Sequence, residues 1–218
     1  MTVFTSRGFL LAAILIIANT SVSFAHVEEV LVEGKAYVPT GISISASQGT
    51  INQQDIDARP RLRTGDILEL IPGMVVTQHS GSGKSNQMFL RGFNLDHGTD
   101  FASYIDGMPI NMRTHGHGQG YTDLNFIIPE VIEKITYKKG AYYADVSDFS
   151  GAGSAEMLTA NRFDTGLIEI TGGEDDFYRL VATDSLHTQT ADWVYALELN
   201  RYDGPWTDIS EDMPAGRP

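Results

Sequence analysis

The chain has 218 residues and a formal net charge of −13, and this length suits either one domain of ordinary size or one domain with part of a second. Because so acidic a chain repels nucleic-acid phosphates, we expect no nucleic acid among its partners. It contains no cysteine, which excludes a disulfide framework and leaves its stability to packing.

The N-terminus has the features of a secretory signal peptide. Residues 1–8 carry a single positive charge, Arg7, and no acidic residue. An unbroken apolar run follows at residues 9–18, and residues 23–25 (SFA) place small side chains where signal peptidase recognises them. The run is shorter than the roughly 20 residues that a membrane-spanning helix needs. We therefore predict a cleaved signal peptide at residues 1–25 and export of the mature protein, with an N-terminal membrane anchor as the alternative.

Residues 26–48 are predicted to form a flexible N-terminal arm. Within it, residues 27–34 (VEEVLVEG) are acidic, aliphatic and β-prone. An extended arm of this kind can add a strand to the sheet edge of a partner protein. The alternative is a frayed terminus or the first strand of the fold.

Short strands and short helices alternate between residues 49 and 160. Thr64 is a candidate cap for a helix at 65–71, which Pro72 and Gly73 would stop, and Pro129 can begin a second short helix. The predicted strands are 50–56, 74–79, 88–92, 102–106 and 134–138. This pattern predicts a small α+β domain that closes near residue 160.

The pattern changes after residue 160. Segments 167–172 and 177–183 are strand-like, and in residues 193–200 bulky apolar side chains alternate with residues such as Ala196 and Glu198. Alternating strands with polar turns and aromatic ends are typical of an outer-membrane β-barrel. A soluble antiparallel sheet with one wet face remains the alternative.

The sequence shows no catalytic arrangement. Residues 81–85 (GSGKS) look like part of a phosphate-binding loop, but Gln78 stands where the motif needs a glycine, and a strand-like segment follows. No Ser-His-Asp order or pair of carboxylates stands out. We therefore predict that the protein is not an enzyme and needs no cofactor.

Five motifs occur in the order and approximate spacing of one known domain. They are 66–74 (DILELIPGM), 89–93 (FLRGF), 104–111 (YIDGMPIN), 128–135 (IPEVIEKI) and 139–144 (KGAYYA). Together they resemble the plug domain of TonB-dependent outer-membrane receptors. The resemblance implies an α+β plug domain with a small mixed sheet at residues 49–160. It also implies that residues 161–218 are the first few antiparallel strands of a transmembrane β-barrel of about 22 strands.

The resemblance also implies location and partners. The receptor would lie in the outer membrane, in contact with lipid through its barrel, and take up a small-molecule or metal-complex substrate. The periplasmic protein TonB would pair by strand addition with a TonB box in the arm and supply energy from the inner-membrane proton gradient. The box would be Val30, Leu31, Val32, Glu33 and Gly34.

Within the plug, the resemblance assigns structural roles. Arg91 would join an ion-pair network between plug and barrel, and Gly92 and Gly107 would serve tight backbone geometry.

About 58 residues follow residue 160, which is room for roughly three barrel strands. Three strands cannot close into a barrel, and open sheet edges are not tolerated in lipid. We therefore expect the barrel to be incomplete in this chain. We expect the chain to be a truncated product or a part of a longer receptor. Two alternatives are a soluble periplasmic binding or interaction domain with a plug-like fold, and a non-functional truncated fragment.

Four of the six histidines fall in three loops that the resemblance turns towards the extracellular face, at 79–86, 94–100 and 113–121. The predicted substrate-contacting residues are His79, His97, His115, His117, Gln119 and Tyr121. Imidazole is a common metal ligand, so His97, His115 and His117 are also predicted metal ligands, with Asp96 or Asp100 completing the site. The alternative is that these histidines are ordinary hydrogen-bonding residues of polar loops.

Overall fold

The computed structural model describes residues 43–61, 63–78, 84–146 and 148–204. The predicted signal peptide, the predicted TonB box, His79 and residues 81–83 of the GSGKS segment lie outside these ranges. Along the described ranges, no helix is both long enough and apolar enough to cross a lipid bilayer.

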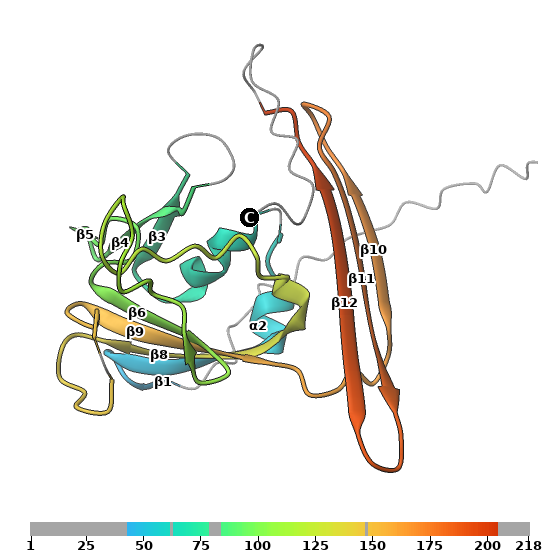
Figure 1. Cartoon of the computed structure of the whole chain (residues 1–218), viewed down its shortest axis with the longest axis horizontal. Coiled ribbons are helices and arrows are strands. Elements are labelled where there is room, and N and C mark those ends of the chain that lie inside the picture. Colours follow the sequence, from blue (N-terminus) through green and yellow to red (C-terminus); the bar gives the residue numbers. More distant parts are fainter. Residues whose placement is uncertain (1–42, 62, 79–83, 147, 205–218) are drawn as a thin grey trace, which may run out of the picture. The chain divides into compact units, whose positions relative to one another are not determined.

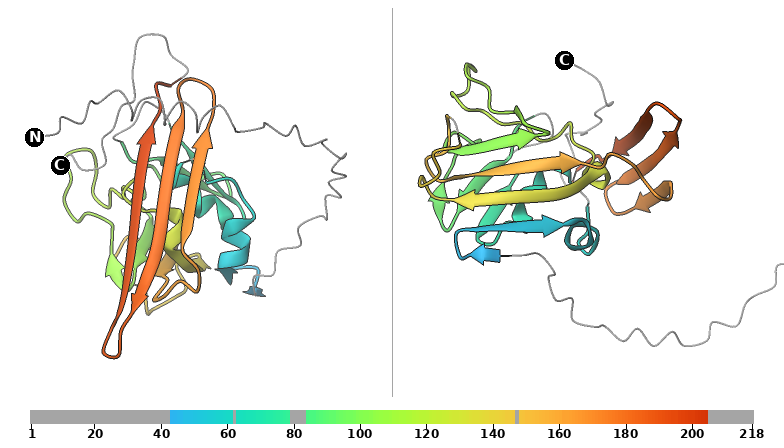
Figure 2. Two further views of the ribbon diagram at one scale, coloured as in Figure 1. Left: turned by 90° about the vertical axis from the view of Figure 1, so that its right-hand side faces the viewer. Right: turned by 90° about the horizontal axis from the view of Figure 1, so that it is seen from below.

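A six-stranded mixed sheet forms the centre of the first part (Figure 1). Its order is β1-β2-β8-β9-β6-β7, and the neighbours are antiparallel except for the parallel pair β6 and β9. The bounds are β1 Ser43–Ser45, β2 Gln48–Asn52, β6 Phe101–Ile105, β7 Met108–Pro109, β8 Ile132–Lys139 and β9 Gly153–Thr159. Figure 2 shows β2, β8, β9 and β6 side by side in its right-hand view.

A smaller antiparallel sheet and three short helices complete this part. The sheet has the order β3-β4-β5, with β3 at Met74–Thr77, β4 at Gln87–Leu90 and β5 at Phe93–Asn94. The helices are α2 at Gln53–Asp57 and the 3₁₀ helices η1 at Thr64–Leu70 and η2 at Pro129–Val131. Leu68, Met88 and Phe101 are fully buried and bring η1 and both sheets into one core. The small α+β domain with a mixed sheet is thus confirmed.

The last described residues form a separate antiparallel sheet, β10-β11-β12. Its strands are β10 Leu167–Gly172, β11 Tyr178–His187 and β12 Asp192–Arg201. On one face Ile170, Leu180 and Leu199 are cross-strand neighbours, and Ile170 is 79% exposed. The exposed large side chains on this face also include Ile168, Tyr178, Trp193, Tyr195 and Leu197. An outward apolar face that carries aromatic residues is the pattern of a lipid-facing barrel wall, so the predicted start of a barrel is confirmed.

Two local predictions were wrong, and one strand was missed. The strand predicted at 50–56 ends at Asn52, because the Asn52 N–H donates to an Asp55 carboxylate oxygen at 3.0 Å and starts helix α2. The helix predicted from Gly65 is a 3₁₀ helix that already includes Thr64, with Arg63 at its N-cap, so Thr64 is not the cap. Strand β9 was not predicted at all.

The predicted role of Gly92 and Gly107 is confirmed. Both have positive φ angles, of 82° and 79°, next to Arg91 and Asp106, which are also left-handed. Two successive residues with positive φ give the tight turn that joins adjacent antiparallel strands. The Asp106 turn is further tied to β9, since Thr159 donates to its carboxylate through both its N–H, at 2.9 Å, and its hydroxyl, at 2.7 Å.

We predict that Gly153→Ala destabilises the fold by about 2 kcal/mol. Gly153 has a φ of +149°, and a Cβ there would lie 2.4 Å from the carbonyl oxygen of Lys138 on β8. Alanine would therefore push β8 and β9 apart. The measurement is denaturant unfolding of the chain in detergent.

Gly172→Ala is the matched control, because a Cβ on Gly172 meets no atom within 4 Å. We expect it to change the free energy of unfolding by less than about 0.5 kcal/mol. Equal effects of the two substitutions would contradict the steric argument.

Candidate functional site

The side chain of Asn111 joins three segments below the predicted substrate-contacting loops. Its Oδ1 accepts from the Ser103 N–H of β6 at 2.7 Å, and its Nδ2 donates to the carbonyl oxygens of Gly98 at 3.0 Å and Gly120 at 3.1 Å. Asn111 is buried, so these bonds are shielded from water. They hold the segment after His97 and the end of the 113–121 loop against strand β6.

The histidine loop, residues 113–120, is anchored at both ends. Met112 and Tyr121 form an antiparallel bridge in which the Met112 N–H donates to the Tyr121 carbonyl at 2.9 Å. The Gly120 N–H donates to the Met112 carbonyl at 2.7 Å. His115 and His117 lie in the exposed part of this loop. A rigid base with an exposed tip is the usual arrangement of a binding loop.

Four aromatic rings of the histidine loop and of the neighbouring 94–100 loop contact one another. The His115 ring stacks on Tyr121 with centroids 4.0 Å apart, and the His117 ring lies edge-on to His97 at 4.5 Å. Tyr121 and His97 are both buried, and their centroids are 5.5 Å apart. The structure thus brings together four of the predicted site residues from two loops.

Asp96, His97 and His117 form a group of candidate metal ligands. Each offers one ligand atom, and these atoms lie within 4.8 Å of one another. His97 Nε2 is 3.7 Å from an oxygen of Asp96. Of the four residues predicted as metal ligands, Asp96, His97 and His117 lie together and His115 is outside the group.

The remaining predicted residues have other surroundings. Gln119 is exposed, and Tyr121 is 9% exposed with its hydroxyl accepting from the Ser85 N–H at 2.7 Å. Tyr121 therefore supports the loop from below. A cavity of about 320 Å³, lined in part by Arg61, Ile67 and Pro129, contains none of the predicted site residues.

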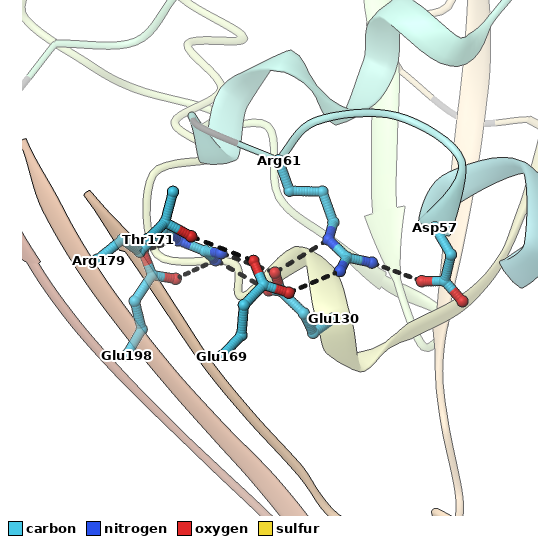
Figure 3. A network of polar contacts seen from close by, with 7 residues as sticks. All are labelled: Asp57, Arg61, Glu130, Glu169, Thr171, Arg179 and Glu198. Atoms are coloured by element: carbon cyan, nitrogen blue, oxygen red, sulfur yellow. Dashed lines mark hydrogen bonds and ion pairs between the residues drawn. The ribbon is translucent and has the colours of Figure 1, made fainter. Parts of the chain in front are cut away.

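A second polar cluster joins the α+β part to the last sheet (Figure 3). We call it the Glu130 ion cluster, and its members are Asp57, Arg61, Glu130, Glu169, Arg179 and Glu198. Arg179 of β11 donates from its two terminal nitrogens to the two oxygens of Glu130, at 2.7 and 2.8 Å. Arg61 approaches the same carboxylate at 3.0 Å from its Nε. Figure 3 shows Glu130 between the two guanidinium groups.

The central pair of this cluster is buried. The side chains of Glu130 and Arg179 are 1% and 3% exposed. Burial alone raises the pKa of Glu130, but the hydrogen bonds and charge of Arg179, assisted by Arg61, outweigh it and hold that pKa below its ordinary value of 4.5. Glu130 is therefore an anion at neutral pH.

Comparison with known proteins identifies the family. Residues 40–154, more than half of the chain, match the TonB-dependent Receptor Plug Domain. The chain belongs to this family. The plug is thus the part built on the six-stranded sheet.

Individual relatives agree with this assignment. The chain is 28% identical over 148 residues to the Vitamin B12 transporter BtuB of Vibrio vulnificus (strain CMCP6), a match that covers 65% of this chain and 23% of BtuB. It is similar in structure to the Copper transporter OprC, with a TM-score of 0.56, 20% identity and coverage of 77% and 26%. It is also similar to the Serratia marcescens hemophore receptor HasR, with a TM-score of 0.51, 22% identity and coverage of 72% and 25%. The structural matches show the fold alone, and the chain spans about a quarter of the length of each relative.

The contact between the plug and the last sheet is made by residues that the sequence analysis did not single out. Arg91 is exposed and donates to the carbonyl oxygen of Ala46 at 3.2 Å, and its predicted place in an ion-pair network between plug and barrel stays a prediction. Among the described residues, Arg61, Glu130 and Arg179 form such a network. The alternation of side chains along the strands was a sequence signal for these residues. It places Arg179 and Glu198 on the face opposite to the apolar one.

We predict that Glu130→Gln destabilises the chain by about 3–5 kcal/mol at pH 7, because it leaves the buried Arg179 with Glu198 as its only carboxylate in the cluster. The folded-state pKa of Glu130 is depressed, so its contribution is complete above about pH 4.5 and is lost as the pH falls through the folded pKa. The difference from the unchanged chain should therefore shrink in acid. Denaturant unfolding in detergent at a series of pH values measures it.

The matched control is Glu133→Gln, since Glu133 is an exposed neighbour on β8. We expect it to change stability by less than about 0.5 kcal/mol. A Glu130→Gln effect that is as small, or that does not depend on pH, would contradict the role of the ion pair.

Proposed function

We propose that this chain is the N-terminal part of an outer-membrane receptor that binds a scarce nutrient outside the cell and takes it up with energy from TonB. The observation that carries the proposal is the combination of a plug domain with the C-terminal sheet β10–β12, joined by the buried Glu130–Arg179 pair. A plug held against a wall strand is the arrangement that closes a wide barrel lumen.

The apolar face of the C-terminal sheet supports a location in lipid. Ile168, Ile170 and Trp193 are 77%, 79% and 63% exposed. In water such a patch invites association, whereas in a bilayer it is the ordinary outer surface of a barrel. This observation favours the receptor over the soluble periplasmic domain.

The N-terminal arm would couple the receptor to TonB. We propose that residues 1–25 direct export and are removed, and that residues 30–34 pair with TonB by strand addition. The outer membrane is far from any source of ATP, so a pulling force transmitted through the periplasm would supply the energy for transport.

The histidine loop would contact the substrate. Its base is fixed by Asn111 and by the bridge between Met112 and Tyr121, while His115 and His117 are exposed. The substrate would be a metal ion, a metal chelate or haem, because imidazole nitrogens coordinate all of these.

We predict that Val32→Pro in the intact receptor abolishes energised uptake without loss of substrate binding. Proline removes the backbone N–H that strand pairing with TonB requires. Val32→Ala keeps this N–H and should retain most of the uptake. Uptake and binding of labelled substrate by whole cells measure both, and normal uptake by the proline variant would rule out residue 32 as part of the box.

We predict that the double variant His115→Ala/His117→Ala weakens uptake while assembly in the membrane stays normal. The loop is anchored by backbone bonds of Met112 and Gly120, so the loss of two exposed rings leaves the plug folded. The measurements are outer-membrane fractionation and calorimetric titration with the substrate. Unchanged substrate affinity would contradict contact through this loop.

A further inference from the structure

We infer that Asp96, His97 and His117 bind a bare divalent transition-metal ion of the Zn²⁺ or Cu²⁺ kind. The inference rests on the proposed function and narrows its substrate from metal compounds in general to the ion itself. The inference follows from the proton on His97, from the exposed position of His117 between two glycines and from the separate role of His115.

The surroundings of His97 determine which ring nitrogen carries the proton. Its Nδ1 lies 2.9 Å from the carbonyl oxygen of Ser85 and 3.3 Å from that of Asn86. Carbonyl oxygens only accept hydrogen bonds, so Nδ1 carries a proton, and in the neutral ring Nε2 carries the lone pair. A histidine that binds a metal usually donates its other N–H to a carbonyl or carboxylate in this way.

The lone pair of Nε2 lies on the side of Asp96. In the neutral ring, Nε2 and the Asp96 oxygen 3.7 Å away are both electron-pair donors, so the two atoms can bind the same cation. That cation is either a metal ion or a second proton on His97. His117 decides in favour of the metal, because it brings a third donor to the same point.

The group needs only a small closure to coordinate an ion. Tetrahedral ligands at bond lengths of about 2.0–2.1 Å are roughly 3.4 Å apart, and the three ligand atoms already lie within 4.8 Å of one another. His97 is buried and fixed, whereas His117 is exposed between Gly116 and Gly118, where an added Cβ would meet no atom within 4 Å. The His117 ring can therefore move towards a fixed Nε2.

His115 supports this site and is not one of its ligands. Its Nδ1 accepts from the His117 N–H at 3.2 Å, and its ring is stacked on Tyr121 with an interplanar angle of 17°. Both contacts hold the loop in the conformation that turns His117 towards His97. This assignment differs from the sequence prediction, in which His115 was a ligand.

Three protein ligands favour the bare ion over a chelate. They leave at least one coordination position for water or for a donor from another part of the receptor. A metal already saturated by a chelator has no position for two imidazoles and a carboxylate. An ion with exchangeable water does, and it can be released again for transport.

The test is calorimetric titration of the chain with ZnCl₂ or CuSO₄, together with electron paramagnetic resonance of the Cu²⁺ form. We expect one ion per chain, with coupling to two imidazole nitrogens. His117→Ala and Asp96→Asn should each weaken binding by at least about tenfold, and His117→Ala should remove one nitrogen from the spectrum. His187→Ala is the control, because His187 is an exposed histidine paired with Asp192 at the β11–β12 hairpin, and it should leave binding unchanged.

The variant His115→Ala tests whether His115 supports the loop or binds the ion itself. It should leave two nitrogens in the spectrum and cost less affinity than His117→Ala. Absence of saturable binding, or equal losses in the His117 and His187 variants, would overturn the site.

The outcomes also separate the site from the proposed function. If the chain binds neither ion but the His115/His117 double variant of the intact receptor loses uptake of another substrate, the site is overturned and the function stands. If the chain binds the ion but the intact receptor accumulates nothing across the outer membrane, the function is overturned and the site stands.

Discussion

The organisation of the molecule depends on the buried pair of Glu130 and Arg179. Removing two charges from water is costly, and the cost is recovered only when their hydrogen-bonding groups are matched. Here two parallel bonds join Glu130 to Arg179, and Glu198 satisfies further donors of the same guanidinium. Each charge also has a partner on its own side, Arg61 for Glu130 and Glu198 for Arg179, and the Glu130–Arg179 pair joins the two sides. The pair therefore specifies which surface of the plug contacts strand β11.

The histidine loop depends on a different physical principle. Its base is fixed by neutral hydrogen bonds to a buried amide, Asn111, and its tip is glycine-rich and exposed. Fixed scaffolds with mobile tips are suited to ligands that must be bound and then released. Buried charge thus secures the structure, and the residues proposed to meet substrate lie where little stability is lost if they move.

Much of the fold could be predicted from local chemistry. The turns at Gly92 and Gly107 follow from short-range backbone requirements, and the alternation in residues 193–200 follows from one apolar face. Strand β9 could not be predicted in this way, because its pairing with β6 and β8 joins distant segments and Gly153 depends on their close approach. Helix α2 was missed because the apolar side chains of Ile51 and Ile56 fit a buried strand as well as a buried helix. The hydrogen bond from the Asn52 N–H to the Asp55 carboxylate favours the helix.

The candidate site shows the same limit. The clustering of histidines was predicted from the sequence, since the resemblance places four of them in three loops on one side of a plug. The sequence did not show which histidines are suited to bind an ion. That depends on the carbonyl groups of Ser85 and Asn86, which fix a proton on Nδ1 of His97. Similarly, nothing local distinguishes the buried Glu130 from its exposed neighbour Glu133 until β11 supplies Arg179.

The central claim is that the plug and the first wall strands are held together by one buried charge pair. A double-mutant cycle with Glu130→Gln, Arg179→Gln and both together, followed by denaturant unfolding in detergent, measures the interaction between the two side chains. We predict a favourable coupling energy of about 2–3 kcal/mol, since substitutions of two residues that form one buried ion pair have non-additive effects on the free energy of unfolding. Additive effects of the two substitutions would contradict the claim.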